Sequence, residues 1–392
     1  MGGVRFKTRE IGSLAKPSWR VKAFAGRPLE EDDIREAERW GRRLDVEGWE
    51  RLVDVLTAGT IGAEERSEVD DWAAHYAIRL LERAGLDVVY DGEQRRTEMY
   101  DHVAAHARGF ESRGTVRSFD NKYYSKAAVV ARPSVEGPQD VEEFRFVRSE
   151  TERELKVPIT GAYTMVDWSY DEHYSRDGAL GASREHRYDA RRRFVTDVAE
   201  QVIRPNLAGL VAAGAHWIQI DEPAAATKTD EVPLVVLGFN DALRGIEAER
   251  KSVHICFSDY SALWPHVLEL EDCLELQLEF ANRDSRELGT SDEDRPGYVD
   301  TLSLFKTHGY PGVGLGVLDI HSDFIEPAEL VRDRILYAVD VLGGPERIEV
   351  NPDCGLRTRS WDVVYEKLSN MVEGTRLAEE VLNRAHAGPS VG

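Results

Sequence analysis

The chain has 392 residues, of which 42% are hydrophobic and 31% are charged, a composition typical of a folded globular protein rather than a disordered one. Fifty Lys and Arg residues against 72 Asp and Glu residues give a formal net charge of −22, which argues against nucleic acid or an anionic membrane as a partner. Three cysteines in so long a chain exclude a disulfide framework.

The beginning of the chain and its hydropathy bear on where the protein works. The first residues, MGGVRFKTREIGS, lack the apolar core of a secretory signal. No run approaches the roughly 18 apolar residues that can span a bilayer. We therefore expect a cytoplasmic protein.

Short apolar runs alternate with amphipathic stretches along the chain. The predicted strands are residues 8–13, 86–91, 157–163, 216–221, 252–257, 274–280, 313–319 and 348–352. Helical patterns are clearest at 70–85, where Gly85 would end the helix, and at 361–385. Eight strands alternating with helices predict an α/β fold, a single (β/α)8 TIM barrel over residues 1–392. A doubly wound sheet is the alternative.

The chain is longer than the roughly 250 residues typical of such a barrel. We expect the surplus in two insertions. Residues 14–69 precede the second predicted strand, and residues 103–150 lie between the second and the third. Within the latter, the run YYSKAAVVARPSVEG suggests an inserted strand or hairpin.

Several predicted strands carry polar side chains on one face. Residues two apart in a strand share a face, which groups Gln219 with Asp221, His254 with Cys256, Gln277 with Glu279, and Asp319 with His321. Strands buried on both faces usually read as nearly continuous apolar runs. We therefore expect these polar groups to form an active site at the C-terminal ends of the strands. The alternative is a scatter of polar groups that are satisfied individually.

Three neighbouring strand ends offer four possible metal ligands. His254, Cys256, Glu279 and Cys354 combine thiolate, imidazole and carboxylate groups, a set that suits zinc. Taken alone, a histidine two residues before a cysteine is a weak signal, because a free cysteine more often packs as a small apolar residue. Cys273 lies outside the pattern and is interpreted as packing.

The motifs of the chain resemble, in order, those of the catalytic C-terminal barrel of cobalamin-independent methionine synthase. They are REIGS, YDGE, TGAYTMVDWS, WIQIDEPA, VHICFSDY, LQLEFANR, GVLDIHS and NPDCGLRTR, and they extend from about residue 9 to 360. The resemblance is specific for the superfamily and less so for the exact substrates. It implies a zinc-dependent methyl transfer to homocysteine that forms methionine.

The resemblance also implies roles for individual residues. Its zinc ligands fall on His254, Cys256, Glu279 and Cys354. Its homocysteine-binding positions fall on Ile11, Gly12, Ser13, Glu93 and Asp221. Trp168 matches an aromatic residue beside the pterin of folate-using members, and His321 with Asp319 matches the proposed proton donor. For Glu93 and Asp221 the alternative is a buried salt bridge, and for Trp168 it is packing.

The methyl donor is left open by two departures from the family. Folate-using synthases resemble this chain only in their second half, and Thr227 stands where they usually carry a glutamate near the folate. The donor is therefore either methyl-tetrahydrofolate or a methylcorrinoid, free or on a corrinoid protein. Two further alternatives are alkyl transfer to another thiol such as coenzyme M, and a non-catalytic module that binds zinc or a thiol.

Overall fold

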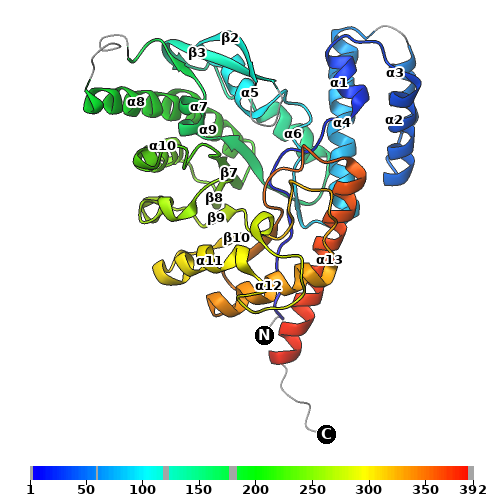
Figure 1. Ribbon diagram of the computed structural model, residues 1–392. Coiled ribbons are helices and arrows are strands. Elements are labelled where there is room, and N and C mark those ends of the chain that lie inside the picture. Colours follow the sequence, from blue (N-terminus) through cyan, green and yellow to red (C-terminus); the bar gives the residue numbers. More distant parts are fainter. Residues whose placement is uncertain (1–2, 59–60, 118–122, 176–182, 387–392) are drawn as a thin grey trace. The chain divides into compact units, whose positions relative to one another are not determined.

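Strands followed by helices recur along the chain, as the alternation of apolar runs predicts (Figure 1). The computed structural model describes residues 3–58, 61–117, 123–175 and 183–386. The chain divides into two units. The first comprises Met1–Arg95, Phe146–Leu155 and Leu278–Gly392, and the second comprises Arg96–Arg145 and Lys156–Gln277.

The second unit is built on short parallel strands. In sheet order these are β5 (Val157–Thr160), β7 (Trp217–Asp221), β8 (Arg250–Ile255) and β9 (Glu275–Leu278). β5 and β7 pair in parallel, as do β7 and β8. The register places Thr160 beside Asp221 and Asp221 beside His254, so the C-terminal ends of these three strands lie at one level.

Helices and an antiparallel pair of strands complete the second unit. The helices are α5 (Met99–His106), α7 (Ala162–Asp167), α8 (Arg184–Val198), a π-helical turn (Ala199–Ile203), α9 (Arg204–Ala212) and α10 (Val232–Leu243), with α6 (Val141–Glu150) contributing to both units. Helices α8, α9 and α10 lie along one side of β7 and β8 (Figure 1). β2 (Arg108–Arg117) pairs antiparallel with β3 (Tyr123–Ser134), and β3 pairs in parallel with β6 (Tyr170–Asp171). Three short 3-10 turns lie at Thr229–Glu231, Tyr260–Leu263 and His266–Glu269.

The first unit contains the parallel pair β10 (Val313–Gly316) and β11 (Ile348–Asn351), and the two-residue strands β1 (Val88–Val89) and β4 (Glu154–Leu155). Its helices are α1 (Ser18–Phe24), α2 (Glu31–Leu44), α3 (Trp49–Thr57), α4 (Ala63–Ala84), α11 (Pro296–His308), α12 (Ala328–Leu342) and α13 (Trp361–His386), with a 3-10 turn at Ala281–Arg283. Gly85 caps α4 with φ of 96°, a left-handed conformation that favours glycine. The predicted helix ends there.

Seven of the eight predicted strands have a counterpart within a few residues of the prediction. The exception is residues 8–13, where Thr8 forms an isolated parallel bridge to Val350 and Arg9 forms one to Val88. Each of these two residues pairs with a different strand, and the backbone leaves the ladder before Gly12. A continuous strand therefore does not form.

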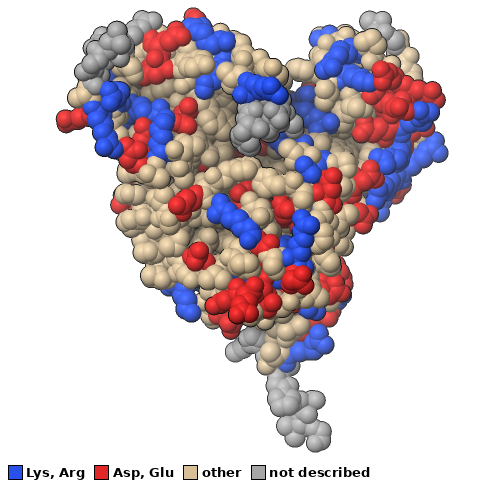
Figure 2. Space-filling model, viewed as in Figure 1, with Lys and Arg blue, Asp and Glu red and all other residues tan. Residues whose placement is uncertain are grey.

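Opposite charges lie close together on the surface. Figure 2 shows acidic and basic side chains intermixed on the face in view, most clearly over α2 and α3. Arg35 on α2 lies 2.8 Å from a carboxylate oxygen of Glu31, and Arg51 on α3 lies 2.9 Å from one of Glu68. These charges on α2 and α3 thus lie in ion pairs. Among the described residues, no helix is long and apolar enough to cross a membrane.

Candidate functional site

The C-terminal end of β8 carries two of the predicted metal ligands. His254 precedes the last residue of β8, Cys256 follows it, and both side chains are buried. The Nδ1 atom of His254 lies 3.1 Å from the backbone oxygen of Gln277. A carbonyl oxygen can only accept, so Nδ1 carries the proton and Nε2 keeps the lone pair that a metal would use.

The turn after Cys256 has a left-handed residue that is not glycine. Phe257 has φ of 52°, and its side chain is 55% exposed. A left-handed conformation costs such a residue about 1–2 kcal/mol. Two hydroxyl groups hold the carbonyls before it: Ser258 Oγ donates to Cys256 at 2.9 Å, and Tyr260 donates to Ile255 at 3.0 Å. These bonds hold the chain where it leaves β8 after Ile255.

In the first unit, a buried carboxylate ties the segment after Glu279 to the segment before Cys354. The carboxylate of Asp353 accepts three backbone N–H bonds, from Phe280 at 2.9 Å, Ala281 at 3.0 Å and Asn282 at 2.7 Å. The Asn282 side chain also donates to Glu279 at 3.2 Å. The two predicted ligands of this unit are thus held by one set of bonds.

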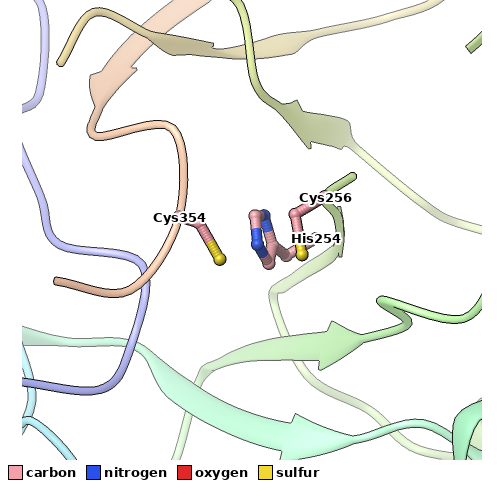
Figure 3. Close-up of side chains that lie close together, drawn as sticks. All are labelled: His254, Cys256 and Cys354. Atoms are coloured by element: carbon pink, nitrogen blue, oxygen red, sulfur yellow. The ribbon is translucent and has the colours of Figure 1, made fainter. Parts of the chain in front are cut away.

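Among the described residues, one group of His, Cys or acidic side chains could hold a metal ion. It consists of His254, Cys256 and Cys354, whose ligand atoms all lie within 4.8 Å of one another (Figure 3). Glu279, the fourth predicted ligand, is not in this group. Two thiols and an imidazole are the donor types that zinc prefers.

Asp221 ends β7 and is held by a chain of polar side chains in the second unit. The amide nitrogen of Gln219 donates to Asp221 Oδ1 at 2.6 Å. The ammonium group of Lys156, directly before β5, donates to the amide oxygen of Gln219. Lys156 and Gln219 are fully buried, and Asp221 is 6% exposed. The predicted binder of the substrate ammonium is therefore anchored from the sheet interior.

The same interior face continues across β8 and β9. The indole N–H of Trp217 donates to Ser252 Oγ at 3.1 Å. Gln277 donates to that same oxygen at 3.1 Å and to Glu275 at 2.7 Å. The polar residues that alternation placed on one face of these strands do contact one another, and they are buried.

The residues predicted to bind the amino-acid part of the substrate in the first unit lie on two tied loops. The backbone N–H of Leu14 donates to Gly92 at 3.0 Å, which joins the loop of Ile11, Gly12 and Ser13 to that of Glu93. Glu93 has φ of 56°, and its N–H donates to Asp91 at 2.8 Å. A side chain at Gly355 would meet Ser13 Oγ at 2.6 Å, so Ser13 lies against the residue after Cys354.

His321 and Asp319 follow β10. The carboxylate of Asp319 accepts the backbone N–H of His321 at 2.8 Å and the hydroxyl of Ser322 at 2.7 Å. The imidazole Nε2 of His321 lies 3.7 Å from Glu279 Oε1, and that carboxylate raises the pKa of His321 while burial opposes the shift. Asp319 therefore shapes the turn, and Glu279 is the carboxylate beside the ring.

Trp168 lies directly after α7 and is half-buried. Its ring is 6.3 Å from that of Tyr100, at an angle of 55°. Thr227 donates to Asp167, the residue before Trp168, at 3.2 Å, and Lys228 donates to the same carboxylate at 2.5 Å. The position that carries a glutamate in folate-using synthases is thus bonded to the neighbour of Trp168.

Two buried carboxylates were not among the predicted site residues. Glu222 follows Asp221; burial, and to a lesser degree the charge of Asp221, raises the pKa of Glu222 to about 7. Asp353 precedes Cys354; burial and then the charge of Glu279 raise its pKa well above the usual range. Each directly follows or precedes a predicted site residue, but both lie beyond the ends of the predicted strands, at 221 and 352, where alternation assigns no face. The one signal in the sequence that could have indicated them is a charged residue directly beside a predicted site residue.

Comparison with known proteins identifies the family. The family model described as "Cobalamin-independent synthase, Catalytic domain" matches residues 47–377. The chain is 38% identical to the methionine synthase of Thermoplasma volcanium over 373 residues, 93% of this chain and 95% of the relative. It is 33% identical to that of Pyrococcus horikoshii over 378 residues, 96% of this chain and 94% of the relative. The chain belongs to the cobalamin-independent methionine synthase family.

Membership in this family confirms the prediction of a methyltransferase of the methionine synthase type. The fold is also shared with a solved structure of the family. The B12-independent methionine synthase from a Shewanella species, determined in complex with selenomethionine, superposes with a TM-score of 0.72 at 22% identity, covering 97% of this chain and 99% of that one. This likeness confirms the α/β class with parallel strands.

Proposed function

We propose that this enzyme transfers a methyl group to the thiol of homocysteine, forming methionine, with zinc at the thiol and a closed (β/α)8 barrel around the site. The observation that carries the proposal is the group of His254, Cys256 and Cys354, in a member of the cobalamin-independent methionine synthase family. A free thiol, with a pKa of about 8.5, is only a few per cent thiolate at neutral pH. Zinc would supply the thiolate by displacing that proton.

We propose His254, Cys256, Glu279 and Cys354 as the zinc ligands. Two thiolates and one carboxylate bring three negative charges to an ion of charge +2. A site of this net charge withdraws little electron density from a substrate sulfur, which therefore stays nucleophilic. Glu279 is the weakest of the four ligands, which agrees with its place outside the group of three. It is the ligand that we expect to yield to the substrate.

The amino-acid part of homocysteine would be bound by two carboxylates and by a loop near the start of the chain. The carboxylates of Asp221 and Glu93 would hold its ammonium group. The backbone of Ile11 and Gly12 and the hydroxyl of Ser13 would hold its carboxylate. Asp221 and Glu93 are at least nine-tenths buried, so a bound ammonium group would meet little competing water.

In the reaction, the sulfur–methyl bond forms as the donor–methyl bond breaks. With methyl-tetrahydrofolate the leaving group is a nitrogen, which must gain a proton, and His321 would supply it on the turn shaped by Asp319. Trp168 would then lie beside the pterin. A methylcorrinoid, alone or on a partner protein, needs no such acid. Methylation assays with each donor in turn, on the wild type and on His321→Ala, separate the two cases.

Thiol selectivity tests the acceptor. In calorimetric titrations of the zinc-loaded protein, we expect homocysteine to bind more tightly than coenzyme M, which lacks the amino-acid group. Tighter binding of coenzyme M would instead support alkyl transfer to that thiol. If the protein keeps its zinc but forms no methionine with any donor, the result would support a non-catalytic binding module.

Zinc content tests the ligand set, and the chain offers a matched control. Cys354→Ser should lower the zinc bound per chain, because a serine hydroxyl stays protonated and is a poor zinc ligand. Cys273→Ser is the control, since the Cys273 thiol is buried and bonded to the backbone of Glu275 at 3.4 Å, away from the group of three. Unchanged zinc content in Cys354→Ser would refute the ligand set.

A further inference from the structure

The interior of the second unit holds a line of three polar side chains that ends at Asp221. Lys156 lies before the start of β5, Gln219 in the middle of β7 and Asp221 at its C-terminal end. Lys156 donates to the amide oxygen of Gln219, whose amide nitrogen donates to Asp221 Oδ1 at 2.6 Å. The line thus runs from the base of the strands to the end where the substrate would bind.

The chemistry of these groups gives the line one direction. An ammonium group can only donate, so Lys156 requires the oxygen of the Gln219 amide to face it. The amide nitrogen must then point the other way, toward Asp221. Without the lysine the amide could turn over and present its oxygen to the carboxylate, which is repulsive. Lys156 therefore sets the orientation of Gln219, and Gln219 sets that of Asp221.

We propose that Gln219 and Lys156 are positioning residues that make the site selective for thiols carrying an α-ammonium group. This inference rests on the proposed binding of homocysteine, and it adds the groups that aim the Asp221 carboxylate. An aspartate side chain with a single fixed orientation binds an ammonium group without first losing rotamer freedom. A carboxylate oxygen has further lone pairs, so the bond from Gln219 leaves acceptor capacity for the substrate.

The test compares two thiols that differ only in the ammonium group. Homocysteine and its des-amino analogue, 4-mercaptobutanoate, are titrated calorimetrically into zinc-loaded protein. The preference is the ratio of the two dissociation constants. We expect the wild type to prefer homocysteine and Gln219→Met to reduce that preference about ten- to a hundredfold, the range for a lost hydrogen bond to a charged group. Lys156→Met should act in the same direction, and zinc content should not change.

A second glutamine provides the matched control. Gln277 is likewise fully buried on the interior face of a strand, and its side-chain amide donates to Ser252 and Glu275 rather than to Asp221. Gln277→Met should therefore lower the unfolding midpoint as Gln219→Met does, yet keep the preference for homocysteine. A purely structural role of Gln219 would make the two variants alike in both measurements.

Should Gln219→Met fail to fold, the double variant Gln219→Met with Lys156→Met removes both polar partners and leaves an apolar pair of similar volume. It should show the same loss of preference as the single variant, because the two residues act in one line. If the variants prefer homocysteine as strongly as the wild type does, the positioning role of Gln219 and Lys156 is refuted, but the binding of the substrate ammonium group by Asp221 is not. A wild type with no preference would overturn both the inference and the assignment of Asp221 to the substrate ammonium group.

Discussion

The stability of the protein should fall as pH rises through the range in which Glu222 loses its proton. The Glu222 carboxylate is fully buried and accepts three hydrogen bonds, from the backbone of Tyr163 at 3.0 Å and of Thr164 at 2.7 Å, and from the Thr164 hydroxyl at 2.6 Å. These donors favour the ionised form, but burial outweighs them and raises the pKa from 4.5 to about 7. The folded state therefore holds a proton that the unfolded state releases.

The sign and size of this effect follow from linkage. Between pH 4.5 and about 7 the folded state binds more protons than the unfolded state, so the stability that Glu222 contributes is complete below about pH 4.5 and lost by about pH 7. At about 1.4 kcal/mol per pKa unit, the shift amounts to roughly 3 kcal/mol. Urea unfolding of the wild type and of Glu222→Gln, from pH 5 to pH 8, measures it. The free energy of the wild type relative to this variant should fall over that range and level off above pH 7.

Thr164→Val provides an internal check on the same carboxyl group. The substitution removes the hydroxyl that donates to Glu222 and leaves the side-chain volume nearly unchanged. Losing a donor to the ionised form should raise the pKa further and extend the fall in stability to higher pH. A difference between wild type and Glu222→Gln that stays level, or that grows with pH, would refute the reasoning, because the three donors would then outweigh burial.

Two further predictions concern the first unit. Lys367→Met should lower the free energy of unfolding by about 3 kcal/mol, because Lys367 lies 2.7 Å from Glu326 with both side chains fully buried, and the carboxylate would keep only the more distant Arg334, at 3.9 Å, as a counter-charge. The double variant with Glu326→Gln should recover part of that loss in the same urea measurement. Gly316→Ala should cost about 1–3 kcal/mol, because the new methyl group would lie 2.2 Å from Asp353 Oδ1 and 2.7 Å from the Leu278 carbonyl. It should also lower zinc content, and unchanged stability and zinc content would contradict the close fit.

Alternation along the strands predicted the buried polar face, because residues two apart in a regular strand always share a face. The contacts of Gln219 with Asp221 and of Gln277 with Glu275, each between residues two apart in one strand, follow from that rule. It also grouped His254 with Cys256, two of the three side chains in the candidate metal group. What it could not give is which polar side chains bond across strands, because that depends on register, which is set by pairing over long distances in the chain.

The prediction of a strand at residues 8–13 was wrong because the sequence of a segment does not tell which strands it can pair with. A strand needs a partner over several residues, and Thr8 and Arg9 find theirs on β11 and β1, one bridge each. The residues after them are Ile11, Gly12 and Ser13, which the family resemblance assigns to substrate binding. A loop can present backbone groups to a ligand only where those groups are not used in a sheet.

The two carboxylates that alternation missed have the same local design. Glu222 follows β7, and a side chain at Gly161, which follows the neighbouring strand β5, would meet its carboxyl carbon at 2.2 Å. Asp353 lies shortly after β11, and a side chain at Gly316, the last residue of the neighbouring strand β10, would meet its carboxylate at 2.2 Å. In each unit a buried acid thus reaches over a glycine at the end of the next strand.

This design explains why an acid and a glycine must occur together. Glu222 accepts three hydrogen bonds from the segment after the neighbouring strand β5. Asp353 accepts three from the segment after β9, which lies beyond β10 in the sheet. Only a residue without a side chain leaves room for the carboxylate there. Because successive residues of an extended chain point to opposite sides, Glu222 fixes the backbone on one side while Asp221, the last residue of β7, is free to face the site on the other. Gly161→Ala should therefore disturb homocysteine binding through Asp221 and leave zinc content unchanged, whereas Gly316→Ala should lower zinc content first.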